Sequence, residues 1–210
     1  MILGGLDIAT TTGAAVMKDG VITTQTFKGP TRKRNILEDE KALDAAHEAK
    51  IGRLFEDFMR VWLMENRVEM VAIEAPLPSN NVRQKTVVDT SSTWAGHALV
   101  KTTEKGASLS SIYRIYGMSM IACAMCERFN IPVRFIAQGT WRKEFLGNGR
   151  PGDAKKEAKL MCARLGIGIS SADAAEAAGI VWTLNKQLNP YTPAANSLFN
   201  LPPTVRDNVG

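Results

Sequence analysis

The chain has 210 residues, of which 45% are hydrophobic and 22% are charged, and its formal net charge is +5. This length and composition are typical of one soluble globular domain and exclude a disordered or fibrous chain. Charged residues or glycines interrupt every apolar stretch well before the ~18 residues that a membrane span needs. The first apolar run has no basic leader and soon meets Asp7, which is unlike a signal peptide, so we expect a cytoplasmic protein without a membrane contact.

The start of the chain predicts a β-meander. Residues 1–9 form an apolar run typical of a buried strand, and two further strands flank the dipeptide Asp19-Gly20, which is favoured in tight hairpin turns. We expect the threonines of "DIATTTG" and Gly13 to form the bend between the first two strands.

A long helix and a buried strand follow. Apolar residues recur at helical spacing over 37–67, and His47, at the edge of that apolar face, is expected to be a packed or half-exposed structural residue. The run "VEMVAIEAPLP" is rich in β-branched residues and must end as a strand by Pro76, because proline lacks the ladder donor. Glu74 stands at the end of this strand.

Helices dominate the second half of the chain. We expect a helix over about 110–129, then the strand "IPVRFIA", then a helix over about 153–165. A last helix begins near Ser170 and contains "ADAAEAAGIVWTL". Antiparallel strands followed by alternating helices and strands predict an α/β fold with a mixed sheet and helices on both of its faces.

Two segments lie outside this pattern. Residues 77–107 are polar and rich in serine, threonine and asparagine, so we interpret them as a loop or small insertion long enough to serve a function. Residues 189–210 hold four of the nine prolines and are expected to form an extended or disordered arm. The main domain therefore spans 1–188.

The cysteines and the basic residues leave more than one interpretation. Cys123 and Cys126 lie in an apolar helical run, and with Cys162 they are expected to be reduced core residues rather than metal ligands. Basic residues gather in "KGPTRKR" (28–34) and between Arg142 and Lys159. These two clusters suit a phosphate backbone if the fold brings them to one face, and otherwise they are solvated loops.

Four acids interrupt apolar segments where core residues would be expected: Asp7, Glu74, Asp173 and Glu176. Asp173 and Glu176 are three apart and share one face of a helix. Several buried carboxylates need compensating cations, and Mg²⁺ is the usual one where phosphate oxygens complete its coordination. Two such ions would activate a water and stabilise a leaving oxygen, which is the chemistry of a nuclease.

The helix acids also have structural interpretations. Asp173 follows Ser170 with capping-box spacing, and an acid in the first turn is favoured by the helix dipole. Glu176 is explained equally well as a solvated helix residue. Asp7 has no obvious structural partner, because its neighbours on both sides are apolar.

The order of these pieces resembles the RuvC family of Holliday junction resolvases, within the RNase H-like superfamily. The matching segments are "ILGGLDIATTTGAAV", "VAIEAPLP", "PVRFIAQGTWRKEFLGNG", "GDAKKEAKLMCARLG" and "SSADAAEAAGIVWTL". The resemblance implies an RNase H-like fold with a five-stranded sheet over 1–188, carrying an insertion at about 77–107.

The resemblance also implies an activity and its residues. Asp7, Glu74, Asp173 and Glu176 would hold two Mg²⁺ ions, or Mn²⁺ in their place, although family members more often have aspartate at the fourth position. Arg142 and Lys155 would contact the scissile phosphate, with Lys143 and Lys156 as alternates. The implied protein is a homodimeric endonuclease that nicks a four-way DNA junction symmetrically, leaving 5′-phosphate and 3′-hydroxyl ends.

The insertion is the main departure from the family. It contains the basic and aromatic residues Arg83, Lys85, Trp94, His97, Lys101 and Lys105. Leu77 stands near the position of the wedge residue that relatives insert into the junction, and Trp94 either replaces it by stacking on a base or anchors the insertion. The residues expected to bind DNA are Arg83, Lys85, Lys143, Arg150 and Lys156.

Three other functions stay open on the sequence. "DIATTTG" also matches the phosphate-binding turn of sugar kinases and actin-like ATPases, but those proteins need two RNase H-like domains and a second phosphate loop. A second alternative is a DNA-binding module without catalysis, and the presence of all four acids argues against it. The third is the same nuclease chemistry acting on flaps, forks or structured RNA.

Overall fold

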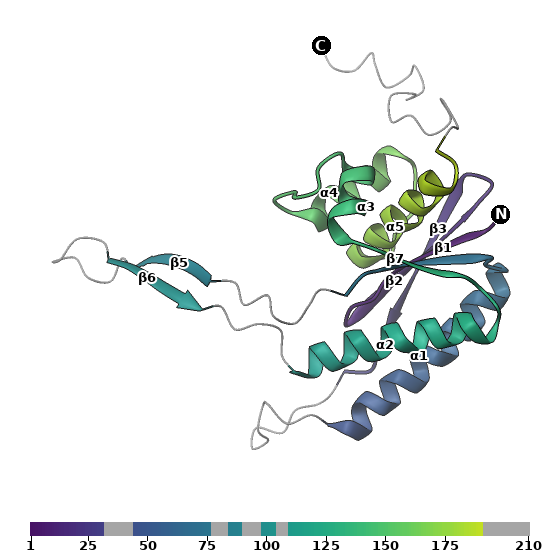
Figure 1. The fold of residues 1–210 in the computed structure, drawn as a ribbon, viewed down its shortest axis with the longest axis horizontal. Helices are drawn as coiled ribbons and strands as arrows, with labels where there is room; N and C mark the ends of the chain where they lie inside the picture. The colour runs from purple at the N-terminus through teal and green to yellow at the C-terminus, as the bar shows by residue number, and fades with distance from the viewer. Residues whose placement is uncertain (32–43, 77–83, 90–97, 104–108, 191–210) are drawn as a thin grey trace, which may run out of the picture.

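The computed structural model describes residues 1–31, 44–76, 84–89, 98–103 and 109–190, with the backbone alone for 84–89, 98–103 and 109–110. Five strands form one mixed sheet in the order β3-β2-β1-β4-β7 (Figure 1). The strands are β1 (Leu3–Asp7), β2 (Thr11–Lys18), β3 (Val21–Lys28), β4 (Met70–Glu74) and β7 (Val133–Ile136).

Antiparallel and parallel pairs divide this sheet. The first three strands are an antiparallel meander, and β1, β4 and β7 run parallel. Helices α1 (Ala45–Asn66) and α2 (Leu109–Arg128) cover one face. The other face holds α5 (Ala172–Leu188), on which α3 (Gln138–Leu146) and α4 (Ala154–Arg164) pack. The predicted fold class, a mixed five-stranded α/β sheet with helices on both faces, is confirmed.

The turn at Asp19-Gly20 is confirmed, whereas the predicted bend before it is right for Thr10 and wrong for Thr11, Thr12 and Gly13. Asp19 and Gly20 have φ of 50° and 81°, as a type I′ hairpin turn requires. Gly13 does not form the bend, because the segment from Thr11 onward is already strand β2 and Gly13 pairs with Asp7. The bend consists of residues 8–10.

Side-chain caps set the helix starts. The first helix begins at Ala45, because the Asp44 carboxylate accepts from the His47 N–H at 3.0 Å. It therefore begins later than the expected residue 37, and residues 37–43 lie outside the described residues. His47 is half-buried, as expected. The last helix begins at Ala172, and its N-cap is Ser171 rather than Ser170. The expected bounds of α2 and α4 agree with the structure within about one residue.

The sequence did not predict α3 or the strands of the insertion. Helix α3 starts at Gln138, and its N-cap Ala137 makes no side-chain capping hydrogen bond, so the usual polar start signal is missing. Within the insertion, β5 (Gln84–Asp89) and β6 (Ala98–Thr103) pair as a separate antiparallel hairpin, apart from the main sheet in Figure 1. The rest of the insertion, and residues 191–210 of the expected arm, lie outside the described residues.

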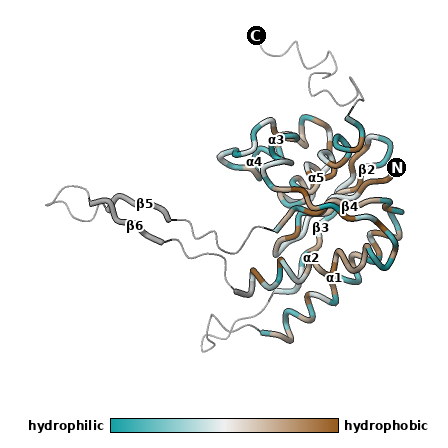
Figure 2. Tube along the Cα trace, viewed as in Figure 1, coloured by the Kyte–Doolittle hydropathy of each residue, from teal (hydrophilic) through white to brown (hydrophobic). Residues whose placement is uncertain are grey.

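Each face of the sheet has its own hydrophobic core. Phe55 and Trp62 of α1 pack against one face, and Trp141 and Phe145 of α3 belong to the core of the other. In Figure 2 the strands of the central sheet carry much of the hydrophobic colour. All three cysteines are free, as expected, and burial raises the pKa of Cys126 to about 12. No helix among the described residues is long and apolar enough to cross a bilayer.

Helix α5 lies unusually close to strands β1 and β2 because glycines face it. A Cβ on Gly5 would lie 2.6 Å from the Ala177 carbonyl oxygen. A Cβ on Gly13 would overlap the Asp173 carbonyl oxygen and lie 2.6 Å from the Ala174 nitrogen. Real Cβ atoms do not approach backbone atoms this closely, so these two glycines permit the contact that holds α5 on the sheet.

Gly13→Ala is expected to destabilise the protein by about 3 kcal/mol or more, because overpacking against backbone atoms cannot be relieved by a side-chain movement. Gly117→Ala is the matched control. Gly117 is an exposed residue inside α2 with open space around it, so the same change should stabilise by about 0.5–1 kcal/mol through helix propensity. Urea unfolding of both variants measures the difference, and equal effects would contradict the close approach of α5.

Candidate metal centre

Strand alternation brings Asp7 and Glu74 to the same face of the sheet. On β1, Leu3 and Gly5 face α5 whereas Leu6 belongs to the opposite core, so Asp7 also points toward α5. On β4, Ala72 lies in the core under α5, and Glu74, two residues on, shares its side. Parallel pairing of β1 with β4 sets the two acids at neighbouring strand ends.

Helix α5 supplies the other two acids. Its N-terminus is fixed by Ser171, whose hydroxyl accepts from the Ala174 N–H at 3.0 Å. Thr26 of β3 ties this end to the sheet, with its hydroxyl 2.7 Å from that of Ser170 and 2.9 Å from that of Ser171. Asp173 therefore falls in the first turn of the helix, where the dipole favours a negative charge.

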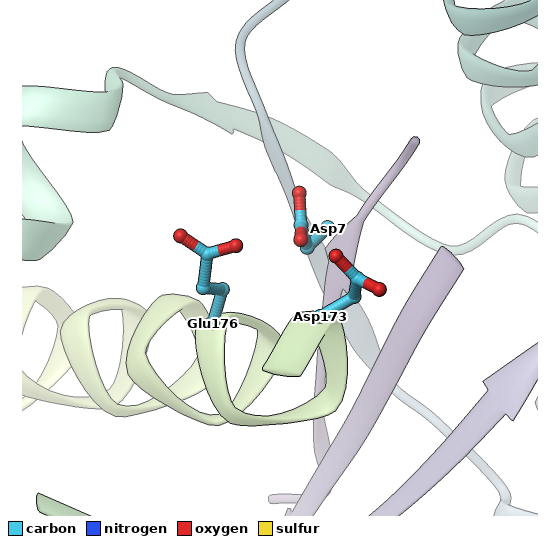
Figure 3. A group of neighbouring side chains, drawn as sticks. All are labelled: Asp7, Asp173 and Glu176. Carbon is cyan, nitrogen blue, oxygen red and sulfur yellow. The ribbon is translucent and has the colours of Figure 1, made fainter. Parts of the chain in front are cut away.

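Three of the four predicted acids form one compact group. Ligand oxygens of Asp7, Asp173 and Glu176 all lie within 4.8 Å of one another, and the side chains converge in Figure 3. The three residues are only 8%, 8% and 5% exposed. Glu176 is therefore not a solvated helix residue.

Glu74 lies beside this group but has its own partners. One of its carboxylate oxygens accepts from Gln138 Nε2 at 2.9 Å and the other from Trp141 Nε1 at 2.9 Å. Its charge still acts on Asp7 and on Glu176, since it raises the pKa of both carboxyl groups. The structure thus brings all four predicted acids into one electrostatic unit.

Burial raises the pKa values of Asp7, Glu74 and Glu176. Burial, followed by the charges of Glu74, Glu176 and Asp173, raises the pKa of Asp7 well above its ordinary value. Burial also raises the pKa of Glu176, and that of Glu74 despite its hydrogen bonds from Trp141 and Gln138. A bound cation would favour the ionised form of these carboxylates and lower their pKa values again.

Two basic side chains reach the acids. Lys155 Nζ of α4 lies 2.6 Å from Asp173 Oδ1 and 3.9 Å from Glu176 Oε2, and the hydrogen bond to Asp173 raises the pKa of this lysine. Arg142 of α3 lies 3.8 Å from Glu176 Oε1, and its guanidinium sits 5.4 Å from the Trp141 ring centroid. Arg142 Nε is buried without a hydrogen-bond partner, so the guanidinium keeps a donor for a further acceptor.

The other predicted DNA-binding residues do not join this group. Lys143, Arg150 and Lys156 are exposed, and no ion pair links them to the acids within the described part of the chain. Lys85 lies in β5, where the backbone alone is described. Leu77, Arg83, Trp94, His97 and Lys105 lie outside the described residues, as do Arg32, Lys33 and Arg34 of the segment 28–34, so the expected shared basic face is not described.

Two residues of the site were missed in the sequence. Gln138 and Trp141 lie three apart on α3, with Arg142 one position further, so that one side of this short helix meets both Glu74 and Glu176. The spacing of Trp141 and Phe145 is helical and was the available signal. It was overlooked because the helix itself was not predicted.

The donor set fits a hard divalent cation. Carboxylate oxygens are the ligands that Mg²⁺ and Mn²⁺ prefer, and the two basic side chains offset only part of the charge of four acids. The alternative of a nucleotide-binding turn is not supported, because Asp7 is directed at other acids rather than at an open phosphate site.

Known structures resemble this chain, although no protein-family model and no curated protein sequence matches it. Thermus thermophilus RuvC is 16% identical, with 90% of this chain and 96% of that chain covered at a TM-score of 0.53. The complex of T. thermophilus RuvC with a Holliday junction substrate is 14% identical, with 91% of this chain and 97% of that chain covered at a TM-score of 0.58. The yeast mitochondrial Holliday junction resolvase Ydc2 is 9% identical, with 89% of this chain and 82% of that chain covered at a TM-score of 0.47. The two T. thermophilus RuvC structures show that the chain has a RuvC-like fold, as the sequence implied.

The metal-free protein is expected to lose stability as pH rises. The folded-state pKa values of Asp7, Glu74 and Glu176 lie above the unfolded values of about 4. Their contribution to stability is therefore fully present below about pH 4 and is lost as pH rises through the raised values. Thermal unfolding with chelator, compared with Mg²⁺ or Mn²⁺, should show that the divalent ion restores stability at neutral pH.

Asp7→Asn is expected to stabilise the metal-free protein at neutral pH, because it removes a buried charge and introduces an amide N–H that can donate to Glu176. The gain should appear as a higher urea midpoint than that of the wild type, measured with chelator at neutral pH. The same variant should lose the stabilisation by Mg²⁺. A variant that is destabilised without metal, or that keeps the full response to Mg²⁺, would contradict the electrostatic description of the site.

Proposed function

We propose that this protein is a Mg²⁺-dependent endonuclease that resolves four-way DNA junctions by symmetric nicking with two divalent ions. The observation that carries the proposal is the group of three buried carboxylates within 4.8 Å of one another, with Glu74 beside it, at the strand ends of a RuvC-like fold. Buried acids in this number do not improve the packing of the core, whereas metal-dependent phosphodiester hydrolysis requires them.

Asp7, Asp173, Glu176 and Glu74 would hold the ions. When bound, such ions lower the pKa of water and neutralise charge on a phosphate. The chain's own cations complete the site: Arg142 has an unused buried donor and Lys155 reaches the acids from α4. We assign both to the scissile phosphate, where they would stabilise the charge that develops during hydrolysis.

The substrate and the assembly are proposed from the same fold. T. thermophilus RuvC has been solved with a Holliday junction substrate, and the net charge of +5 suits a polyanion. We therefore propose a cytoplasmic homodimer that places one active site on each of two symmetric strands and leaves 5′-phosphate and 3′-hydroxyl ends. Arg83, Lys85, Lys143, Arg150 and Lys156 are the proposed contacts with the DNA backbone.

The hairpin β5–β6 favours a second candidate substrate class. It stands in the insertion between β4 and α2 and begins at Gln84, ten positions after Glu74, so that a change in this segment would alter how branched DNA approaches the acids. The same chemistry acting on forks, flaps or structured RNA is therefore the alternative. A DNA-binding module without catalysis is disfavoured because all four acids lie together.

The purified protein is expected to nick a synthetic four-way junction with Mg²⁺ or Mn²⁺ and not with chelator. Asp7→Asn should abolish nicking and leave junction binding intact, because only a metal ligand is lost. Junction, fork, plain duplex and RNA/DNA hybrid should be compared side by side on denaturing gels. Cleavage without metal, or full activity of Asp7→Asn, would overturn the mechanism, and preference for the fork would establish the alternative substrate.

Lys155→Gln is expected to lower the cleavage rate of the bound junction at least 10-fold, as loss of one group that stabilises transition-state charge does. Lys50→Gln is the control for net charge, since Lys50 is exposed on α1 on the opposite face of the sheet. Single-turnover rates at saturating protein separate this effect from binding. Equal rates for both variants would contradict the role of Lys155.

A further inference from the structure

Glu74 differs from the other three acids in how it is held. Its two carboxylate oxygens are each engaged by a side chain of α3, one by the Gln138 amide and one by the Trp141 indole, both at 2.9 Å. The carboxylate is therefore fixed at two points, which defines the plane of the group as well as its position.

Both donors are neutral, and this matters for a cation. A carboxylate has about four lone-pair sites, so one hydrogen bond to each oxygen leaves a site on each oxygen free. A lysine or arginine at the same place would bring a positive charge and compete with a divalent ion. Neutral donors orient Glu74 and preserve its capacity to bind metal.

The indole of Trp141 is itself held rigidly. Trp141 is fully buried, and a Cβ on Gly179 of α5 would lie 2.9 Å from its Cε3 atom and 2.7 Å from Cδ1 of Phe145. The ring is thus pressed against the helix that carries Asp173 and Glu176. The position of Glu74 on β4 is coupled, through one tryptophan, to the acids on α5.

We propose that Trp141, together with Gln138, is a positioning residue that fixes Glu74 as the fourth carboxylate of the metal centre. The inference rests on the proposed metal-dependent function and adds to it a specific role for α3. Trp141 supplies the rigid contact, and Gln138, which is half-buried, supplies the adjustable one. Partners of this kind are typical of metal sites, where their loss weakens binding about 10–100-fold.

Trp141→Phe tests the proposal, because it keeps an aromatic ring in the core and removes the N–H. Calorimetric titration with Mn²⁺ should show binding weakened about 10-fold or more. Trp182→Phe is the matched control, since Trp182 also packs on Phe145, with ring centroids 6.0 Å apart, and should bind Mn²⁺ as the wild type does. Gln138→Leu, on a half-buried side chain, should weaken binding less than Trp141→Phe and provides a second variant if Trp141→Phe does not fold.

A double-mutant cycle with Glu74→Gln separates positioning from a general structural role. If Trp141 acts through Glu74, adding Trp141→Phe to Glu74→Gln should change Mn²⁺ affinity less than 2-fold, because the group it orients no longer binds metal. An equal loss in both backgrounds would overturn the proposal. Wild-type affinity of Trp141→Phe and of Gln138→Leu would also overturn it.

The metal-free protein gives an independent readout. The four tryptophans give separate indole N–H resonances in ¹⁵N-labelled protein, and the Trp141 signal is the one absent from Trp141→Phe. Glu74→Gln should move this signal and leave that of Trp182 in place, and an unmoved signal would overturn the proposal. Because this measurement needs no cleavage, a protein that shows the coupling but nicks no junction would refute the proposed function alone.

Discussion

The contact between helix α5 and strands β1 and β2 is the constraint on which the rest of the site depends. Gly13 stands opposite Asp7 in the sheet, and the first turn of α5 rests directly on it. Because no Cβ separates the two backbones, Asp173 and Glu176 are brought over the strand end that carries Asp7. Gly5 of β1 likewise allows close contact with Ala177 of α5. The helix therefore cannot tilt away from the sheet without losing packing at both glycines.

This arrangement concentrates repulsion between carboxylates in the proposed metal centre. Burial and mutual repulsion raise the pKa values of Asp7, Glu74 and Glu176. Lys155 and Arg142 relieve part of the repulsion from outside α5. The two hydrophobic cores, one on each face of the sheet, stabilise the fold and offset the destabilisation caused by the buried acids. Such local conflict with the rules of stable folding is expected at functional sites.

The sequence predicted most of the fold, because hydrophobic period and turn chemistry are local. The meander, its Asp19-Gly20 turn and the four acids were all visible in this way. Helix α3 was not visible, since Ala137 gives no polar start signal, and the hairpin β5–β6 was missed in a polar segment. The role of Gly13 was misjudged because a glycine that permits close packing looks, in sequence, like one that permits a turn. The partners of Glu74 were missed with α3, since contacts 64 and 67 residues apart leave no local trace.

The small residues of the α5 interface also bear on how far such sequences can diverge. The geometry of the acid group needs little more than glycine at two strand positions, alternation along β1 and β4, and an alanine-rich helix to lie on them. Most other core positions accept any apolar residue of suitable volume. Many different sequences can therefore meet these requirements, so a fold shared with T. thermophilus RuvC needs no more than the 14–16% identity observed.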